Sequence, residues 1–565
     1  MSEERTNDPQ SGISRRKFIG TMALAMGAVA TSCHKVPEML TEEIGGRPNI
    51  LIIMADDMGY SDINCYGGEI NTPNINSLAE GGVRFTNFYN CARCVATRAS
   101  ILTGLTPSQA GLGLERRGRE AAGSHGGLSK NCVTIAEVLK GAGYHTLMSG
   151  KWHLAGDEIG LWDDKKATTQ DRWPLQRGFD RYYGTIEGSG SYFYPPTLVE
   201  GNTPIDSEGP GYYYTDAVTD NMVRFVKEHA ESESKKPFFG YLAYTAPHWP
   251  LHAPESEIAK YKGKFDKGWD ALRQKRYERM IKMGLIDPKW PLSEKDPDIP
   301  DWVDEKDKEW WARHMEVYAA QVDVMDQGVG KIMDVLNEKG LTENTLVLFL
   351  SDNGGCAEHI GDWVKDFLCW PEGGMTRDGR PIKDRHSRDV LPGPEDTYMS
   401  YQARWAHLSN TPYRKYKSFL HEGGISTPLI AYWPSRIKRR GVLEEQVGHV
   451  YDLMGTCLDL AGAEYPTERK GESVIPTEGV SIVPALYGSK IKRGTDIFGW
   501  EHIGHRAVRK GKWKIVSLRG EKPWELYDIE ADRTEMNNLA DQYPERVEEM
   551  VKIYKDWEQR SRLSE

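Results

Sequence analysis

The stretch Asn49-Ile50-Leu51-Ile52-Ile53-Met54 is apolar at every position after the first, and it runs directly into Ala55-Asp56-Asp57. Such a run, without polar alternation, predicts a strand that is buried on both faces of a parallel sheet. Two later apolar runs also end in polar residues: Pro237–Tyr244 before Thr245-Ala246-Pro247-His248, and Thr345–Leu350 before Ser351-Asp352-Asn353-Gly354-Gly355. Ligands of open α/β sheets bind beyond the carboxyl ends of the strands, so these strand ends predict one shared site.

Helical patterns between these strands predict an α/β fold. The segment Thr134–Ala142 begins with a capping box, Thr134 with Glu137, and leads into a strand-like segment at His145–Ser149. Apolar residues at spacings of three and four from Tyr318 to Leu336 predict an amphipathic helix ahead of the Thr345 strand. This alternation of strands and helices favours a mainly parallel sheet that is sandwiched by helices.

The pattern changes near residue 486. Short alternating segments at 507–509, 513–516 and 525–528 predict a small antiparallel sheet, and Tyr543–Gln559 predicts one helix packed on it. The predicted domains are a leader and linker at 1–45, an α/β catalytic domain at 46–485 and a small C-terminal α+β domain at 486–565. The chain has 565 residues, beyond the roughly 250 to 300 at which a single core usually stops growing.

The first residues have the features of an export signal. Ser14-Arg15-Arg16-Lys17-Phe18-Ile19 is a twin-arginine pattern, and the apolar run Thr21–Ala30 is too short to span a bilayer. We therefore expect export in folded form by the twin-arginine machinery to the periplasm, with no transmembrane span in the mature chain. Cys33 follows Ala30-Thr31-Ser32, a weak lipoprotein box, so lipidation at Cys33 is left open. A formal net charge of −11 argues against a nucleic-acid partner.

Cys91 and Cys94 form one CxxC pair, for which buried thiols or a redox pair are the ordinary interpretations. The residues after Cys94 change that interpretation, because Cys94-Val95-Ala96-Thr97-Arg98 is followed by an apolar stretch that ends in Thr103-Gly104. This segment resembles the signature of the sulfatases: Cys or Ser, any residue, Pro or Ala, any residue, Arg. Cys91 does not fit, since Val95 stands where the signature has Arg. The resemblance covers residues 47 to 565 and implies an alkaline-phosphatase-like fold.

In that family a maturation enzyme oxidises the cysteine to formylglycine (3-oxoalanine), whose hydrated aldehyde is the nucleophile. The resemblance therefore implies transesterification of sulfate to residue 94, followed by elimination of sulfate through the second hydroxyl of the diol. Ala96 stands where Pro is commonest and Thr97 where Ser or Ala is commonest, which leaves the choice of maturase open.

The polar residues at the ends of the first and third apolar runs predict a metal site. Asp56, Asp57, Asp352 and Asn353 offer only oxygen ligands, which suits a hard cation such as Ca²⁺ or Mg²⁺ rather than zinc. The resemblance implies that these four residues, with the formylglycine oxygen from Cys94, hold one divalent ion, most often calcium.

The resemblance also assigns cationic and proton-transferring residues. It implies that Lys151 and Lys417 bind sulfate and that Arg98 fixes the formylglycine. His153, in Gly150-Lys151-Trp152-His153, is implied as the base beside the diol, and His248 as the acid at the leaving oxygen. Other histidines and aromatic residues near these motifs are expected to be structural or to line the substrate pocket: His252, His314, His407, His421, Tyr192, Phe193 and Tyr194.

The predicted function is hydrolysis of a sulfate ester to an alcohol and inorganic sulfate, with sulfated carbohydrates or aryl sulfates as the preferred substrates. Loops at 155–215, 255–312 and 355–410 are expected to shape the pocket for the alcohol. One alternative is a formylglycine-dependent phosphonate or phosphodiester hydrolase. The other, if Cys94 stays unmodified, is an inactive protein that binds sulfated glycans.

Overall fold

A computed structural model of the chain describes residues 46–113, 127–155, 170–207, 209, 211–366, 370–520 and 523–561. The twin-arginine pattern and Cys33 lie outside these residues, so the export and lipidation predictions stay predictions. Within the described part of the chain, no helix combines the length and the apolar character that a bilayer crossing requires.

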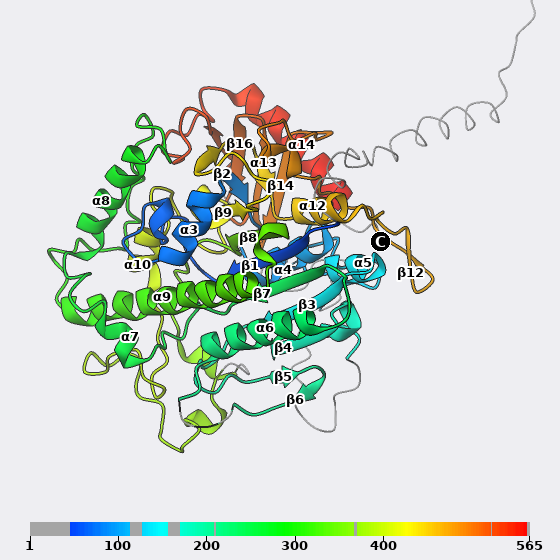
Figure 1. Cartoon of the computed structure of the whole chain (residues 1–565). Helices are drawn as coiled ribbons and strands as arrows, with labels where there is room; N and C mark the ends of the chain where they lie inside the picture. Colours follow the sequence, from blue (N-terminus) through cyan, green and yellow to red (C-terminus); the bar gives the residue numbers. More distant parts are fainter. Residues whose placement is uncertain are drawn as a thin grey trace, which may run out of the picture. The chain divides into compact units, whose positions relative to one another are not determined.

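The central sheet is mainly parallel, as predicted (Figure 1). Strand β1 pairs in parallel with β7 on one side and β8 on the other, and β7 pairs in parallel with β3. Antiparallel strands stand toward the edges, where β9 pairs with β8 and β2. Within the described residues the sheet has 11 strands, β11 (Gly448–His449) pairing with β2 and the others following the order β10 (Val442–Glu444), β2 (Val83–Tyr89), β9 (Ser426–Tyr432), β8 (Thr345–Ser351), β1 (Asn49–Ala55), β7 (Phe238–Ala243), β3 (His145–Gly150), β4 (Arg181–Thr185), β5 (Leu198–Glu200) and β6 (Thr203–Pro204).

Helices cover both faces of this sheet. Leu51 and Ile53 of β1 belong to one apolar cluster, whereas Ile50, Ile52 and Met54 belong to another. The first cluster contains the apolar faces of α3 (Pro73–Gly81), α6 (Tyr214–Glu231) and α9 (Lys308–Glu338), and the second those of α4 (Cys94–Thr103), α5 (Ile135–Gly141) and α12 (Asp452–Ala461). The prediction that this strand is buried on both faces is confirmed. The capping box of α5 is also formed.

The chain ends in a separate four-stranded antiparallel sheet with one packed helix, as predicted. Its strands follow one another in sequence order: β14 (Ile497–His502), β15 (His505–Lys510), β16 (Trp513–Ser517) and β17 (Glu525–Asp528). Val508, Ile515 and Leu526 pack against α14 (Pro544–Ser561), and the opposite face packs against Tyr89 and Ile425 of the α/β unit. Strand β14 was not predicted, and the domain boundary at 486 stays a prediction.

The interpretation of 255–312 as loops was wrong in part. This segment contains α7 (Glu255–Ala259), α8 (Gly268–Lys282) and the start of α9. Helix α8 buries Trp269 together with Arg276, which forms an ion pair with Asp62 at 2.9 Å. Charged residues therefore lie on the buried face of this helix. The prediction was wrong because the charged composition of the segment had suggested a solvated loop. The described part of 355–410 is irregular apart from two short 3-10 turns and α10 (Gln402–Ser409).

Candidate active site

The predicted oxygen ligands meet beyond the carboxyl ends of two neighbouring parallel strands. Asp56 and Asp57 follow β1, and Asp352 and Asn353 follow β8; all four side chains are buried. The backbone N–H of Asp57 donates to Asp352 Oδ1 at 3.2 Å, and Asn353 Nδ2 donates to Asp57 Oδ1 at 2.7 Å. The β1–β8 register brings the two strand ends together, because Ala55 pairs with Ser351.

Two buried cations lie against these carboxylates. Arg98 of α4 lies 3.0 Å from Asp352 Oδ2 and 3.3 Å from Asp56 Oδ2, and Lys151 Nζ lies 2.5 Å from Asp56 Oδ2. Burial alone would raise the pKa of Asp56, but Lys151, His248 and Arg98 outweigh it and hold the pKa below its ordinary value. Burial and the neighbouring charge of Asp56 raise the pKa of Asp352 to about 7. The cluster is therefore a tightly coupled set of opposite charges.

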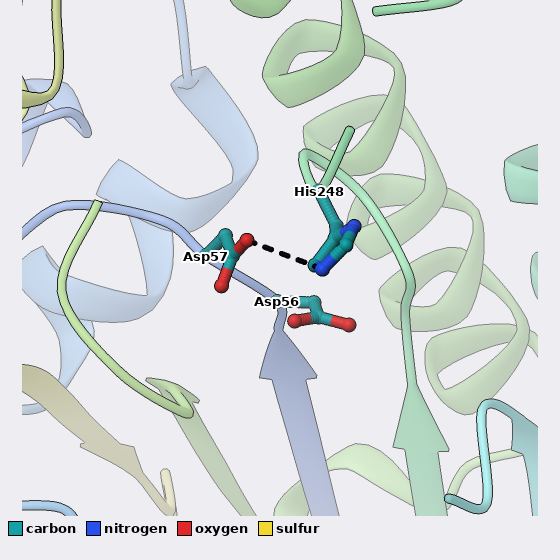
Figure 2. A group of neighbouring side chains, drawn as sticks. All are labelled: Asp56, Asp57 and His248. Atoms are coloured by element: carbon teal, nitrogen blue, oxygen red, sulfur yellow. Dashed lines mark ion pairs between the residues drawn. The ribbon is translucent and has the colours of Figure 1, made fainter. Parts of the chain in front are cut away.

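His248 and Lys417 approach Asp57 from the other side. His248 lies on the loop that follows β7 and points toward the end of β1, where Asp56 and Asp57 stand (Figure 2). The shortest distances are 3.3 Å from His248 Nε2 to Asp57 Oδ2, 2.8 Å from Lys417 Nζ to Asp57 Oδ1 and 3.2 Å between Lys417 Nζ and His248 Nε2. Burial lowers the pKa of His248 to about 4. Burial alone would lower the pKa of Lys417, but Asp57 reverses this and raises it well above its ordinary value.

Cys94 is the first residue of α4 and is buried. Arg98, one turn further along the same helix, makes the ion pairs described above, so the helix carries Cys94 and the cluster's arginine together. The segment before Cys94 is tied to the Lys417 segment, because the N–H of Ser418 donates to Ala92 O at 2.7 Å. The negative charge of a Cys94 thiolate would act on both Arg98 and Lys417.

His153 follows β3 and lies beside Lys151. Its backbone φ is 59°, and its ring packs so closely on Gly188 that a Cβ there would stand 2.4 Å from the ring's Cε1 atom. Only glycine fits that position without displacing the ring. Burial, reinforced by Lys151 and Arg98, lowers the pKa of His153 well below its ordinary value. Within the described residues Nδ1 is shielded from solvent and has no hydrogen-bond partner, so the ring offers a neutral imidazole with an unused nitrogen.

The donor atoms fit a hard divalent cation. Asp56, Asp57 and His248 each present one ligand atom, and these three atoms lie within 4.8 Å of one another. Counting the described residues only, Asp56 Oδ1 and Asn353 Oδ1 are buried oxygens without a hydrogen-bond partner. A buried acceptor without a partner is costly, and a bound cation is one way to satisfy such an oxygen. The oxygen-rich set favours calcium or magnesium. His248 also lies within reach of the same position, although the sequence did not predict it as a ligand.

Three side chains next to the cluster were not predicted as functional. Arg93 Nη1 lies 2.5 Å from Glu358 Oε1, and Trp249 Nε1 donates to Glu358 Oε2 at 3.0 Å. Glu358 Oε2 is also 3.9 Å from Lys417 Nζ. Arg93 and Trp249 each adjoin a predicted site residue in sequence, whereas Glu358 stands in an irregular segment that carries no recognisable motif.

Three of the other histidines named from the sequence, His252, His314 and His421, make contacts of a structural kind. His252 bonds Thr397 O at 2.6 Å, His314 bonds Trp310 O at 2.7 Å, and His421 pairs with Glu525 at 2.8 Å. Tyr192 is buried and donates to the carbonyls of Thr245 and His248, both at 2.9 Å. It therefore supports the loop that carries His248.

Sequence comparisons match this arrangement with one family. The family model described as Sulfatase matches residues 48–463, and that described as N-sulphoglucosamine sulphohydrolase, C-terminal, matches residues 414–560. An uncharacterized sulfatase of Schizosaccharomyces pombe is 33% identical over 539 residues, which cover 90% of this chain and 93% of that protein. An arylsulfatase of Klebsiella aerogenes is 32% identical over 465 residues, 79% of this chain and 94% of that protein.

Solved structures share the fold. One, determined in complex with its substrate D-glucosamine-2-N,6-O-disulfate, superimposes with a TM-score of 0.57 at 21% identity, covering 91% of this chain and 98% of that one. At this identity the likeness concerns the fold alone. The central parallel sheet with its helical layers and the small C-terminal sheet is thus a known architecture.

Proposed function

Since the chain belongs to the sulfatase family, whose members hydrolyse sulfate esters, we propose that it is an active sulfatase with formylglycine at position 94 and one bound calcium ion. One observation carries the proposal. Cys94 and Arg98 lie on one helix, and Arg98 binds the two strand-end carboxylates Asp56 and Asp352. The signature segment and the predicted metal ligands therefore form a single buried site.

The sulfate ester is bound by the cations of this site. Lys151, Lys417 and Arg98 neutralise the negative charge that develops on the sulfate oxygens during transfer. When present, formylglycine supplies a hydrated aldehyde, in which one hydroxyl attacks and the other allows elimination without attack of water on sulfur. A thiol at position 94 cannot supply the second hydroxyl.

Proton transfer is assigned to the two histidines. His153 is neutral and has an unused Nδ1 atom, which makes it a suitable base for a hydroxyl proton on residue 94. His248 faces the site through Nε2, beside the ammonium of Lys417. Burial lowers the pKa of His248, but the negative charge of a bound sulfate ester would raise it. We assign the protonation of the leaving alcohol oxygen to His248, with Lys417 holding that oxygen in place.

The metal site is assigned to Asp56, Asp57, Asp352, Asn353 and the oxygen of residue 94. A bound Ca²⁺ would neutralise the neighbouring carboxylates and add positive charge beside the sulfate, and Mg²⁺ is the alternative ion. Asp56 Oδ1 and Asn353 Oδ1, buried and without partners among the described residues, support this assignment.

The substrate is a sulfated carbohydrate or an aryl sulfate. Support comes from the Klebsiella aerogenes arylsulfatase and from the structure that holds a glucosamine disulfate. On the twin-arginine pattern we propose export to the periplasm, after processing by a formylglycine maturase. Lipidation at Cys33 is an open part of this proposal.

Two measurements on the purified protein test the proposal. Conversion of the Cys94 thiol to the aldehyde lowers the intact mass by about 18 Da, and a Cys94-containing peptide should carry the whole difference. The protein should hydrolyse 4-nitrophenyl sulfate in preference to bis(4-nitrophenyl) phosphate. The reverse preference would favour the phosphodiesterase alternative, and an unmodified thiol with no turnover would favour the glycan-binding one.

A further inference from the structure

A small group of side chains, two of them partly exposed, lies directly outside the buried site. Arg93, Glu358 and Trp249, the rim group, are joined by the ion pair and the indole hydrogen bond described above. The side chains of Arg93 and Glu358 are 31% and 28% exposed, whereas those of Lys417 and Asp57 are 1% and 2% exposed. The rim group therefore stands at the boundary between the buried site and solvent.

Each member of the rim group is attached to a residue assigned to the chemistry. Arg93 directly precedes Cys94, Trp249 directly follows His248, and Glu358 lies 3.9 Å from the ammonium of Lys417. His248 protonates the leaving oxygen in the proposed reaction. The alcohol half of the substrate must then extend from His248 toward solvent, which brings it against the rim group.

An exposed indole extends this surface. Trp363, on the 3-10 turn Asp362–Asp366, is 43% exposed, and its ring centroid lies 6.0 Å from that of Trp249 with the ring planes at 81°. The solvent-facing side of the rim group therefore offers the apolar face of Trp363 together with the carboxylate of Glu358 and the guanidinium of Arg93. Arg93 and Lys417 outweigh the effect of burial and hold the pKa of Glu358 well below its ordinary value, so this carboxylate accepts hydrogen bonds at neutral pH.

This combination distinguishes two substrate chemistries. A sugar ring has an apolar C–H face and hydroxyl groups around its edge, so it can cover an indole while its hydroxyls donate to a carboxylate. A simple aryl sulfate covers the indole but has no hydroxyl to donate. This inference rests on the proposed function. We propose that Glu358, Arg93 and Trp363 form the subsite for the alcohol half, and that Glu358 makes this subsite select a polyhydroxylated ring, a saccharide sulfate, over a hydroxyl-free aryl sulfate.

The test is a ratio of specificity constants. The full-length converted enzyme is assayed on 4-nitrophenyl sulfate and on a panel of monosaccharide sulfates, including galactose 6-sulfate and N-acetylglucosamine 6-sulfate. In Glu358→Gln, kcat/KM for the best saccharide sulfate should fall at least about tenfold further than kcat/KM for 4-nitrophenyl sulfate, mainly through KM. Trp363→Ala should lower both constants, because both ring types cover the indole, and should leave their ratio closer to that of the wild type.

Glu228→Gln is the matched control, since Glu228 pairs with Arg181 at 2.5 Å on the surface, away from the site residues. It should leave both constants unchanged. Equal losses on both substrates in Glu358→Gln would overturn the inference and make Glu358 a structural partner of Arg93. A wild type that cleaves 4-nitrophenyl sulfate but no saccharide sulfate would also overturn it while leaving the proposed function intact, whereas cleavage of neither would contradict the proposed function.

Discussion

Among the described residues, two buried clusters of opposite charges differ in how completely their charged oxygens are paired. The strand-end cluster comprises Asp56, Asp57, Asp352, Arg98, Lys151 and Lys417. The C-terminal ion cluster comprises Glu422, Glu535, Lys514 and Arg533.

In the C-terminal ion cluster every carboxylate oxygen has an ion-pair or hydrogen-bond partner, and Glu535 Oε1 has only the ion pair with Lys514. Lys514 Nζ lies 2.7 Å from Glu422 and 2.8 Å from Glu535, Arg533 Nε lies 2.9 Å from Glu422 Oε2, and the N–H of Glu422 donates to Glu535 Oε2 at 2.8 Å. In the strand-end cluster the printed ion pairs of Asp56 run through Oδ2, and Asp56 Oδ1 and the neighbouring Asn353 Oδ1 have no hydrogen-bond partner among the described residues. A closed set of buried charges stabilises a fold only while it is complete, whereas an open set retains binding capacity. Substitutions in the C-terminal ion cluster should therefore affect mainly stability, and substitutions in the strand-end cluster should affect mainly activity.

The largest expected effect is a loss of activity on replacing Cys94, the first residue of α4. The same helix carries Arg98 of the strand-end cluster. Cys94→Ala removes the precursor of the nucleophile and should lower kcat on 4-nitrophenyl sulfate at least about 10³-fold. The change removes one small side chain, so the melting temperature without calcium should stay close to that of the wild type. Near-normal turnover by this variant would sink the assignment of residue 94.

The second largest effect should appear in stability. Lys514→Met leaves Glu422 and Glu535 buried without their shared cation, which should lower the free energy of unfolding by about 3 to 5 kcal/mol. Urea unfolding at pH 7, followed by tryptophan fluorescence, measures the change. Lys512→Met is the control from the same sheet, because Lys512 is 46% exposed and pairs with Asp528 at the surface. Equal midpoints for the two variants would show that the buried cluster contributes no more than a surface pair.

Much of the fold, but less of the site, could be predicted from the sequence. The strands β1, β7 and β8 were predictable because each is a continuous apolar run, a local property. Strand β14 was missed because Gly499 interrupts its pattern, and the reason for that glycine is tertiary: a Cβ there would stand 2.2 Å from the indole of Trp557.

The site shows the same division between local and distant information. Asp56, Asp57, Asp352 and Asn353 were predicted to meet because parallel strands end at one edge, and the structure places them together. Glu358 was missed because its partners, Arg93 and Trp249, are more than a hundred residues away in sequence. No motif marks a residue whose significance comes only from such contacts.

The third prediction concerns the acid limit of the C-terminal ion cluster. Burial alone would raise the pKa of Glu422, but Lys514, Arg533 and Arg509 outweigh it and lower the pKa from 4.5 to about 2. Because the folded-state pKa is depressed, Glu422 contributes stability that is present above pH 4.5 and is lost as the pH falls toward 2. The loss should amount to about 3 kcal/mol. It should appear as a steeper fall in unfolding free energy between pH 5 and 2 for the wild type than for Glu422→Gln, and parallel curves would contradict it.

The smallest expected effect tests whether the strand-end cluster is open to a cation. If Ca²⁺ binds Asp56 and Asp57 in the folded state only, then Ca²⁺ at about 100 times its dissociation constant should stabilise the protein by about 2.7 kcal/mol. The melting temperature should rise on titration with Ca²⁺ after treatment with a chelator, and less with Mg²⁺, which demands a more regular ligand geometry. Asp57→Asn should abolish the rise, whereas Asp216→Asn, at a surface carboxylate that pairs with Lys331, should retain it. An equal rise in both variants would place the calcium elsewhere, and the two buried clusters would then differ in composition alone, without a difference in their capacity to bind.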